Sequence, residues 1–561
     1  MATSKLLVTA AIAALSVMGY GLRIGYQRRS KVNRLRKQGM AMPPWSWLFG
    51  HLKVLQSQLN GAPPDANVYW AMRDLAVEHA DTEVFLMDFW PMFTPVLMIS
   101  DPEMSLQVSN QYNLPKPESQ HKSMAPIVGG PSLISMNDTD WKYWRSLLNP
   151  GFSASAMADL VPSVVDTVAL FCERLRQKVG SPAFRLDDLT MDLSMDVITK
   201  VTLDTDLHTQ RREHPLAHAL RTIIAWHSFW DPRVLLNPLR PLVQWYYGRI
   251  MDSLIRAEIA KRFEELKEKL ATADPKGTKN KSVISLALND YVAGRRQKGE
   301  VEAKDLKLDD AFSRIAANQI RLFLFAGNDS TSCAIVYAYH LLSRHPDVLA
   351  DLQAEHDAIF GPVEETASKL KNEPALLNKC KQTLAVIKET LRLYPPAASM
   401  REGKLGVSLT DKNGNIYPTD GLEATIMHHS VHRNPRFWPR PEEFLPQRWL
   451  VGPGHELYNP PNNGSYRPFE LGPRNCIGQT LIYNEIRIVL VMTLRSFRIQ
   501  PAYDEWDAMQ RRSEGVLTKL ARKCGLKGEV PKTHRGERAY QTTNTGARPA
   551  DGYPCTVSAL K

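Results

Sequence analysis

The sequence has few cysteines, and none of them are paired in the way that a structural metal site requires. Six occur among 561 residues, and no two are spaced as C-x-x-C. A zinc site and a disulfide framework are therefore poorly supported. This cysteine usage fits a reducing compartment, where a thiolate can persist. The six are Cys172, Cys333, Cys380, Cys476, Cys524 and Cys555.

The sequence also lacks an internal repeat and a basic helix with interleaved aromatic residues. The net charge of +11 therefore does not indicate a nucleic-acid partner. Hydrophobic residues make up 43% and charged residues 23%, which is typical of a folded protein with a large core. The length would allow roughly three or four domains, but we expect one large domain at residues 51–520, followed by a C-terminal tail at 521–561.

A long apolar run lies near the N-terminus, at Leu6–Leu22. Its length of about 17 residues is near the lower limit for spanning a bilayer. A cleaved signal peptide is the alternative, but its positive charges would precede the apolar core, whereas here they mostly follow it. By the positive-inside rule the basic flank and everything after it stay cytosolic. We therefore predict a single-pass anchor at residues 1–28 in the endoplasmic reticulum membrane, and a proline-containing linker at 29–50.

A lone cysteine lies between two glycines, ahead of an apolar segment with helical spacing. The loop runs from Phe469 to Gly478 and reads F-E-L-G-P-R-N-C-I-G. At the start of a helix, a thiolate of Cys476 would be stabilised by free N–H groups and by the helix dipole. Gly472 and Gly478 would let the backbone turn tightly and approach a flat ligand. The loop therefore predicts sulfur presented to a metal, although a single cysteine taken alone would fit an ordinary buried thiol.

The pattern F-x-x-G-x-R-x-C-x-G resembles the haem-ligand loop of the cytochrome P-450 monooxygenases. The resemblance implies that Cys476 is the axial ligand of the iron of haem b, and that Phe469, Arg474 and Gly478 belong to the cofactor site. It covers about residues 40–520, with further motifs in the family's order. It implies a mainly α fold with a small β-rich lobe, and haem buried between a long helix and the cysteine loop.

Several upstream residues resemble the haem contacts of this family. Trp141 and Arg145 lie at i and i+4 of a predicted helix and so share one face. The W-x-x-x-R motif implies that both contact haem, with the arginine meeting a propionate. Arg401 matches a second propionate-binding arginine, and His432 is expected as a third contact. The segment before this helix, residues 116–135, is rich in Pro, Gly and Ser and is predicted to be a long loop.

A long helix is predicted from Asp309 or Asp310 to about Ser343. Gly327 lies in its middle and weakens a helix interior by roughly 1 kcal/mol relative to alanine. We therefore expect a local opening of the helix that leaves room for dioxygen and water.

The stretch A-G-N-D-S-T at residues 326–331 resembles the family's oxygen-activation motif, A-G-x-D-T-T. The resemblance implies that Asp329 and Ser330 relay protons to oxygen through ordered water. Ser330 replaces the usual threonine and retains its hydroxyl. Thr331 follows about 100° further around the helix, so it should point away from the oxygen pocket.

Glu389 and Arg392 match the family's E-x-x-R helix, and Arg448 matches the third member of that charge network. The resemblance implies a buried structural network that positions the segment leading into the cysteine loop. A surface salt bridge of a few tenths of a kcal/mol is the alternative. The alternating apolar residues of Val84–Ser100 predict a pair of strands at the edge of a small sheet.

These motifs imply a monooxygenase that oxidises a lipophilic small molecule, and the C-terminal tail resembles those of fungal members that modify secondary metabolites. Phe323, Phe325 and Ala397–Met400 indicate an apolar pocket. Nothing resembles a flavin or nicotinamide site, so electrons are expected from the NADPH-cytochrome P-450 reductase, with cytochrome b5 as an optional partner. A reductase-independent rearranging or dehydrating enzyme and a non-enzymatic haem sensor are the alternatives, and the Asp329–Ser330 pair counts against the first.

Overall fold

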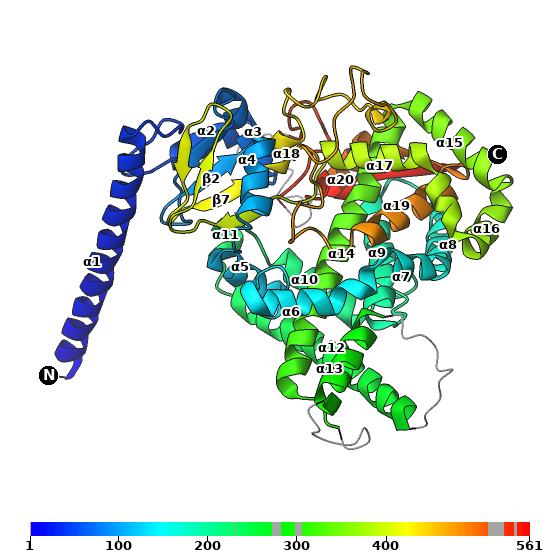
Figure 1. Cartoon of the computed structure of the whole chain (residues 1–561), viewed down its shortest axis with the longest axis horizontal. Coiled ribbons are helices and arrows are strands. Elements are labelled where there is room, and N and C mark those ends of the chain that lie inside the picture. Colours follow the sequence, from blue (N-terminus) through cyan, green and yellow to red (C-terminus); the bar gives the residue numbers. More distant parts are fainter. Residues whose placement is uncertain are drawn as a thin grey trace.

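The computed structural model describes residues 2–229, 232–271, 282–297, 306–513, 532–543 and 547–560. Helices make up most of this part of the chain, and a small sheet lies beside them (Figure 1). The mainly α architecture with a β-rich lobe is therefore as predicted. The helices are α1 (Ala2–Lys37), α2 (Leu52–Leu59), α3 (Val68–Glu78), α4 (Pro102–Leu106), α5 (Glu118–Val128), α6 (Asp138–Leu148), α7 (Ala154–Asp159), α8 (Val161–Lys178), α9 (Leu186–Leu203), α10 (Pro215–Ala225), α11 (Pro232–Leu235), α12 (Arg240–Ala271), α13 (Val283–Gln297), α14 (Asp310–Arg344), α15 (Pro346–Phe360), α16 (Thr366–Asn372), α17 (Lys381–Leu393), α18 (His428–Val431), α19 (Gln479–Thr493) and α20 (Tyr503–Ser513).

The β-rich lobe is built on a sheet with the strand order β1-β2-β7-β4. β1 and β2 are antiparallel, which confirms the predicted strand pair, and β2 runs parallel to β7. One face of the sheet packs against the end of α1, and the other packs against α3, because apolar residues alternate along the strands. The strands of the molecule are β1 (Val84–Met87), β2 (Val96–Ile99), β3 (Phe184–Arg185), β4 (Ser399–Glu402), β5 (Ser408–Thr410), β6 (Ile416–Pro418), β7 (Glu423–Ile426), β8 (Phe497–Pro501) and β9 (Pro554–Ala559).

Helix α14 runs through the middle of the helical part (Figure 1). The side chain of Asp309 caps it by accepting hydrogen bonds from the N–H groups of Ala311 and Phe312. The predicted helix is therefore observed, with its start at the predicted capping residue. The helix continues unbroken through residues 326–331, so the expected local opening is not present.

The glycine of α14 has a different explanation, which is the close approach of α9. A Cβ at Gly327 would lie 2.7 Å from the side chain of Ile198. The two helices are also joined by hydrogen bonds, from Asn328 Nδ2 to Met191 O and between Thr190 Oγ1 and Ser332 Oγ. Gly327 therefore permits helix packing, and α14 keeps its regular geometry.

The segment predicted to be a long loop at residues 116–135 contains helix α5 instead. Met124, Ile127 and Val128 are buried on it, and Gly129, with φ of +87°, follows as a left-handed C-cap. The prediction was wrong because tertiary burial of this apolar face outweighs the local preference of Pro126 and the serines for irregular structure.

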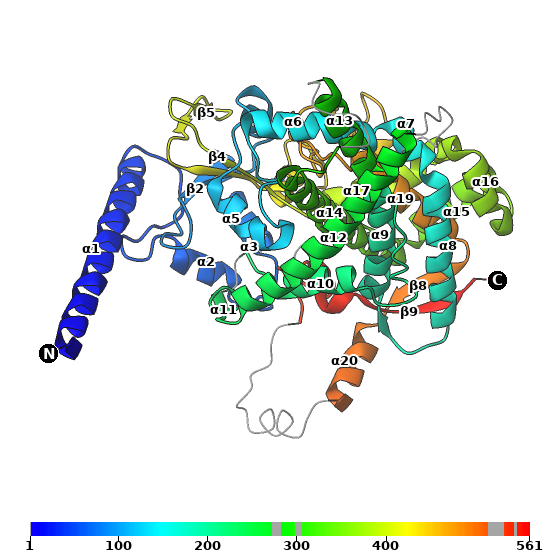
Figure 2. The same cartoon turned by 90° about the horizontal axis from the view of Figure 1, so that it is seen from below.

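The N-terminal helix differs from the predicted anchor and linker. α1 extends to Lys37, so the first part of the predicted linker at 29–50 is helical. Arg29 is buried and forms an ion pair with Asp88, and Val32 and Leu35 pack against the sheet. The earlier part of α1 projects away from the body of the molecule (Figures 1 and 2).

The predicted single-pass span is not supported by the structure. Within the part of the chain that the structure describes, no helix is long and apolar enough to cross a membrane. The side chains of residues 6–11, 13 and 14 of the predicted run lie outside that part. The described apolar side chains further along α1 are largely exposed: Ile12, Leu15, Val17, Met18, Tyr20, Leu22 and Tyr26.

The described part of the predicted tail, 532–543 and 547–560, is integrated into the domain. β9 lies between β3 and β8, and Tyr553, Cys555 and Val557 belong to the main hydrophobic core. The hydroxyl of Tyr337 on α14 donates to the carbonyl oxygen of Ala539. The predicted boundary at residue 520 therefore does not separate a free tail from the fold.

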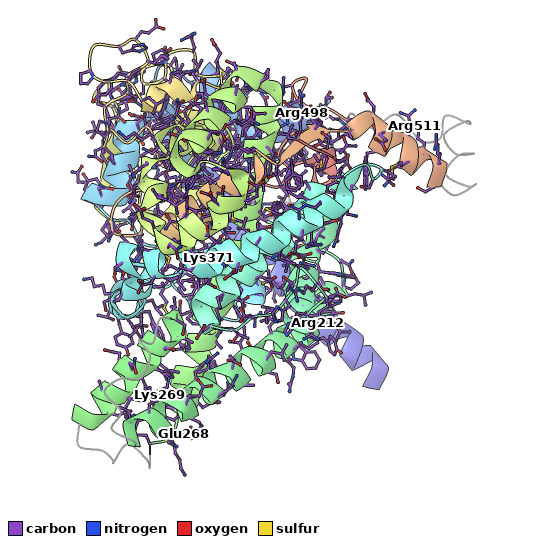
Figure 3. The ribbon with its side chains drawn as sticks, turned by 90° about the vertical axis from the view of Figure 1, so that its right-hand side faces the viewer. Arg212, Glu268, Lys269, Lys371, Arg498 and Arg511 are labelled. Atoms are coloured by element: carbon purple, nitrogen blue, oxygen red, sulfur yellow. The ribbon has the colours of Figure 1, made fainter. Side chains whose placement is uncertain are left out.

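Basic residues on the face shown in Figure 3 come from separate elements. Arg212 precedes α10, Lys269 ends α12, Lys371 lies on α16, Arg498 on β8 and Arg511 on α20. They lie apart from one another in this view.

Candidate active site

The cysteine loop ends where α19 begins. Gly478 is the N-cap residue of α19, and the N–H of Cys476 donates to the carbonyl oxygen of Phe469 at 2.8 Å. Phe469 is buried and packs edge-on against Tyr483 of α19, with ring centroids 5.0 Å apart. Cys476 itself is only partly buried. The loop therefore holds its thiol at a helix N-terminus, as the sequence predicted.

The two glycines of the loop have different surroundings. Gly472 has a φ of +81°, and a Cβ there would lie 2.6 Å from the carbonyl oxygen of Ser109. A Cβ at Gly478 would meet only the sulfur of Cys476, at 3.9 Å. Gly472 is therefore required by a left-handed backbone and by a neighbouring segment, whereas the space beside Gly478 lies next to the thiol.

The ionisation of Cys476 is subject to opposing influences. Burial raises the pKa of the Cys476 thiol, while the N–H of Gly478 and the charge of Arg145 act in the other direction. Arg145 lies close because its guanidinium donates to the carbonyl oxygen of Asn475 at 2.9 Å and to Asn475 Oδ1 at 2.8 Å. A metal ion at the sulfur would add the positive charge that favours a thiolate.

Four cationic side chains gather around this loop. Arg474 donates to the carbonyl oxygen of Met136 and to Asn137 Oδ1, and it lies over the ring of Trp141 at 4.6 Å. Arg401 is 1% exposed and donates to Ser399 Oγ. The four are Lys116, Arg145, Arg401 and Arg474.

Burial and repulsion from a neighbouring cation lower the pKa values of two of these side chains. Burial and the neighbouring Arg401 lower the pKa of Lys116 well below its usual range. The same two causes lower the pKa of Arg474 to about 10. Glu470 is an anion near Lys116 and Arg401. Burial raises the pKa of Glu470, but Arg467 and His428 outweigh burial and bring that pKa well below its usual range. The cluster therefore has an excess of positive charge.

This cluster fits a group that carries two carboxylates. Within the described residues, no carboxylate forms an ion pair with any of the four cations, and the Nε atoms of Arg401 and Arg474 are buried without a hydrogen-bond partner. Arginine is suited to bidentate binding of a carboxylate. The two propionates of haem b match this donor set.

Sequence reasoning missed Lys116 and the residue that links it to the cluster. The side chain of Asn137 accepts from the N–H of Lys116 and donates to its carbonyl oxygen, and it also accepts from Arg474. Asn137 is also the N-cap residue of α6, where its side chain makes no capping hydrogen bond. No spacing signal marks Lys116, because its contacts join a loop to positions more than 280 residues away, such as Met400.

His432 was predicted to contact a propionate, but its ring is engaged elsewhere. Its Nδ1 hydrogen-bonds to the carbonyl oxygen of Arg392, and its Nε2 accepts from the N–H of Arg467. Both ring nitrogens are therefore used by the main chain, so the geometry does not support a cofactor contact. The histidine instead connects α17 to the segment that enters the cysteine loop.

The structure brings together the predicted charge network. Glu389 is fully buried and receives two hydrogen bonds from Arg392, at 2.8 and 2.9 Å, and one from Arg448, at 3.2 Å. Trp449 Nε1 also donates to it. Because Arg392 bonds to the carbonyl oxygen of His432, the network continues towards the cysteine loop.

The middle of α14 is buried except at residues 325–327 and 330, where Ala326 is exposed. The hydroxyl of Ser330 is on this open face and donates to the carbonyl oxygen of Ala326 at 2.7 Å. Thr331 is 1% exposed, and its hydroxyl has no hydrogen-bond partner among the described residues. The two hydroxyls therefore point to different surroundings, as the helical geometry predicts.

Asp329 is buried and forms an ion pair with Arg548, whose Nε lies 2.6 Å from Asp329 Oδ1. A second carboxylate, Asp187 of α9, lies 3.7 Å from the same guanidinium. Burial lowers the pKa of Arg548, but the two aspartates outweigh it and raise that pKa overall. Sequence reasoning missed Arg548, which lies 219 residues after Asp329.

A cavity of about 290 Å³ lies between α5, the sheet and Phe325 of α14. Its walls include Phe89, Phe93 and Phe229, and it also reaches Ala397–Met400 through Ala397, Ala398 and Met400. Phe323, the other residue expected in an apolar pocket, is buried in the main core instead. The lining suits a lipophilic molecule.

Comparisons with known proteins agree with these features. The family model described as Cytochrome P450 matches residues 40–523. The chain is 38% identical over 544 residues to the cytochrome P450 monooxygenase polC of Polytolypa hystricis, covering 95% of this chain and 92% of that protein. It is 30% identical over 515 residues to acrF of Aspergillus aculeatus, covering 88% and 98%. Among solved structures, the haem domain of cytochrome P450DA superposes with a TM-score of 0.67 at 18% identity, covering 93% of this chain and 97% of that one.

Proposed function

Because the chain belongs to the cytochrome P450 family and is a monooxygenase that binds haem b, we propose that it inserts one oxygen atom from O2 into a lipophilic small molecule. The observation that carries this proposal is the partly buried thiol of Cys476 at the start of α19, surrounded by four cations without ion-pair partners in the described chain. Haem bound there supplies the activation of dioxygen, with the cysteine thiolate as its electron-rich ligand.

Side chains of this chain would bind the carboxylate groups at the edge of the cofactor. Lys116, Arg145, Arg401 and Arg474 would bind the propionates, and Trp141 would keep the Arg474 side chain in place through its ring. The N–H of Gly478, directed at the sulfur of Cys476, would moderate the charge of the thiolate.

On the open face of α14, Ser330 would hold a water molecule, and Asp329 would supply protons to it. The hydrogen bond from Ser330 to Ala326 keeps the hydroxyl at the exposed turn of the helix. Arg548, whose Nε lies 2.6 Å from Asp329 Oδ1, would hold this carboxylate in place.

The electrons would come from NADPH through a partner reductase, since no motif in the sequence resembles a flavin or nicotinamide site. Two similar proteins come from the fungi Polytolypa hystricis and Aspergillus aculeatus. This likeness and the apolar cavity favour a fungal secondary-metabolite intermediate as the substrate.

Association with the endoplasmic reticulum membrane is part of the proposal and rests on α1. Its described apolar side chains are exposed, at 72% for Val17 and 66% for Leu22, and basic residues such as Arg23 and Arg28 follow them. A helix with this distribution can place its apolar residues in lipid and its basic residues at anionic head groups.

The ligand assignment is tested with reduced protein and carbon monoxide. The wild-type protein should show the red-shifted Soret band of thiolate-ligated haem, and Cys476→Ala should lose it. Cys172→Ala, which removes a thiol from α8, is the control and should keep the band. A Cys476→Ala spectrum identical to wild type would show that another residue binds the iron.

The reaction is tested with the reductase, NADPH and isotopically labelled dioxygen. A lipophilic substrate should gain one labelled oxygen atom, with NADPH consumed in proportion. Conversion of a substrate without NADPH consumption would instead favour the reductase-independent rearranging enzyme.

A further inference from the structure

Among the described residues that line the apolar cavity, one carries a carboxylate, and it lies on the sheet side. Glu423 begins β7 and lines the cavity together with Thr425 of the same strand, Met98 of β2 and Met400 of β4. These residues lie on the sheet face opposite Ala424 and Ile426, which pack towards α1. The carboxylate therefore belongs to the cavity wall and not to the protein surface, and it is 6% exposed.

Glu423 is held by one hydroxyl. Ser119 Oγ of α5 donates to Glu423 Oε1 at 2.8 Å. Within the described residues, no lysine or arginine forms an ion pair with Glu423, and Oε2 has no side-chain donor. Burial and the charge of Glu402 raise the pKa of the Glu423 carboxyl, and the Ser119 hydrogen bond and the charge of Arg28 only partly offset this. A carboxyl group with spare acceptor capacity in an apolar cavity is costly unless something else bonds to it.

The cavity also determines where a bound molecule would extend. Its far wall includes Phe325, which directly precedes the exposed Ala326 of α14. A molecule bonded to Glu423 at one end would therefore run between the aromatic side chains towards the open face of α14. Such a molecule is lipophilic along its length and polar at one end.

We propose that Glu423 binds the substrate by accepting a hydrogen bond from a hydroxyl or amine group at one end of an otherwise apolar molecule. This inference rests on the proposed function and names the chemistry of its substrate. Ser119 orients the carboxyl group by occupying one oxygen, which leaves the other for the ligand. Glu423 thus contributes to specificity, and it lies apart from the cysteine loop and from Ser330.

The probes are farnesol, farnesyl methyl ether and farnesylamine, and the measurement is the dissociation constant by equilibrium dialysis of the haem-loaded protein. The three share one apolar chain and differ only at the end that would meet Glu423. Wild-type protein should bind farnesol or farnesylamine about 10-fold more tightly than the ether, which corresponds to roughly 1.4 kcal/mol. Equal affinity for all three would overturn the proposal.

Three variants separate the possible ligand groups. Glu423→Leu should abolish the preference over the ether while leaving ether binding within about twofold. Glu423→Gln keeps an acceptor but removes the charge. It should therefore keep the binding of farnesol, whose hydroxyl needs only an acceptor, and weaken the binding of the protonated farnesylamine about 10-fold. Ser119→Ala should reduce the preference by a smaller factor.

The matched control is Glu402→Gln. Glu402 is the exposed register partner of Glu423 on β4, so the change removes the same charge one strand away, outside the cavity. Although the charge of Glu402 also raises the pKa of the Glu423 carboxyl, the preference for farnesol and farnesylamine over the ether should remain in Glu402→Gln. A preference that falls equally in Glu402→Gln and Glu423→Gln would show a general charge effect and would overturn the proposal.

Failure of this inference can be distinguished from failure of the proposed function. Carbon monoxide spectra and NADPH-dependent oxygen uptake report on the cofactor and the reaction, and they do not depend on the Glu423 preference. If those signals are present and the preference is absent, Glu423 has no role in substrate recognition. A Glu423→Leu protein that fails to fold leaves Glu423→Gln and Ser119→Ala to decide.

Discussion

Two adjacent hydroxyl groups on α14 are placed differently enough to be separated by mutation. The hydroxyl of Ser330 lies on the open face and is bonded to Ala326, whereas that of Thr331 is buried without a partner among the described residues. A buried hydroxyl without a partner costs free energy, so its removal is neutral or stabilising when the shape is kept.

We expect Ser330→Ala to lower the product formed per NADPH consumed by roughly 10-fold, because the water for proton delivery loses its anchor. Ser330→Thr should keep the wild-type ratio. Thr331→Val is the matched control and should change the ratio little. Asp329→Asn should slow turnover most, by roughly 100-fold. If Thr331→Val uncouples the reaction and Ser330→Ala does not, Thr331 carries the hydroxyl.

At the scale of single residues, the sequence predicts those functional residues that lie in motifs of fixed spacing. Cys476, Arg145 and Glu389 occupy motif positions. The structure places Glu389 in the predicted charge network and Arg145 beside the cysteine loop, while the haem contacts of Cys476 and Arg145 stay predictions. Lys116 and Arg548 could not be predicted in this way, because each acts on residues far away in the chain and has no motif around it. His432 lies in a motif, yet its two nitrogens bond to the main chain, which only the tertiary structure reveals.

At the scale of elements, the contact between α9 and α14 depends on the absence of one methyl group. The Cδ1 and Cγ1 atoms of Ile198 lie 2.7 Å from the position that a Cβ of Gly327 would take. Real Cβ atoms do not approach other carbons so closely, so the Ile198 side chain or one of the helices would have to move. Hydrogen bonds between the helices, such as that from Asn328 Nδ2 to the carbonyl oxygen of Met191, oppose that movement.

We expect Gly327→Ala to lower the free energy of unfolding by about 1–3 kcal/mol, even though alanine is the better helix former. Adding Ile198→Ala to this variant should cost less than the same change in wild type, because it removes the clash. Denaturant titration of the four proteins in this cycle measures the coupling. Gly294→Ala on α13, where a Cβ would meet nothing within 4 Å, should instead stabilise by roughly 1 kcal/mol. A similar stabilisation in Gly327→Ala would show that the helices are not tightly packed there.

The periodicity of the sequence located α14 and the strands β1 and β2, since each has a strong pattern of its own. It did not locate α5, whose prolines and serines favour a loop locally, while Met124 and Ile127 are buried only in the folded protein. The prediction of a local opening at Gly327 was also wrong. A glycine in a helix can be required by a closely packed neighbouring helix as well as by a ligand.

At the scale of the whole molecule, α1 is divided between a longer first part, whose described apolar side chains are largely exposed, and a shorter last part that belongs to the fold. Arg29 forms a buried ion pair with Asp88, which also accepts from Trp45 Nε1. Val32 and Leu35 are buried against the sheet. The change from exposed to buried side chains occurs close to Arg29.

We expect removal of residues 1–28 to release much of the protein from membranes and to leave haem binding intact. Removal of residues 1–37 should lower stability by about 3–5 kcal/mol, because Asp88 would remain buried without its arginine. Sedimentation with membranes measures the first effect, and thermal unfolding of the haem-loaded protein measures the second. Equal stability of the two truncated proteins would mean that the end of α1 contributes nothing to the fold.

The ion pair between Arg548 and Asp329 has a consequence for the synthesis of the protein. Both Asp329 and Asp187 emerge from the ribosome long before Arg548, since 219 residues separate Asp329 from its partner. Until then the contact between α9 and α14 would enclose two negative charges with no cation between them, which opposes its completion. Completion of the contact between α9 and α14 is therefore favoured only once residue 548 has been made.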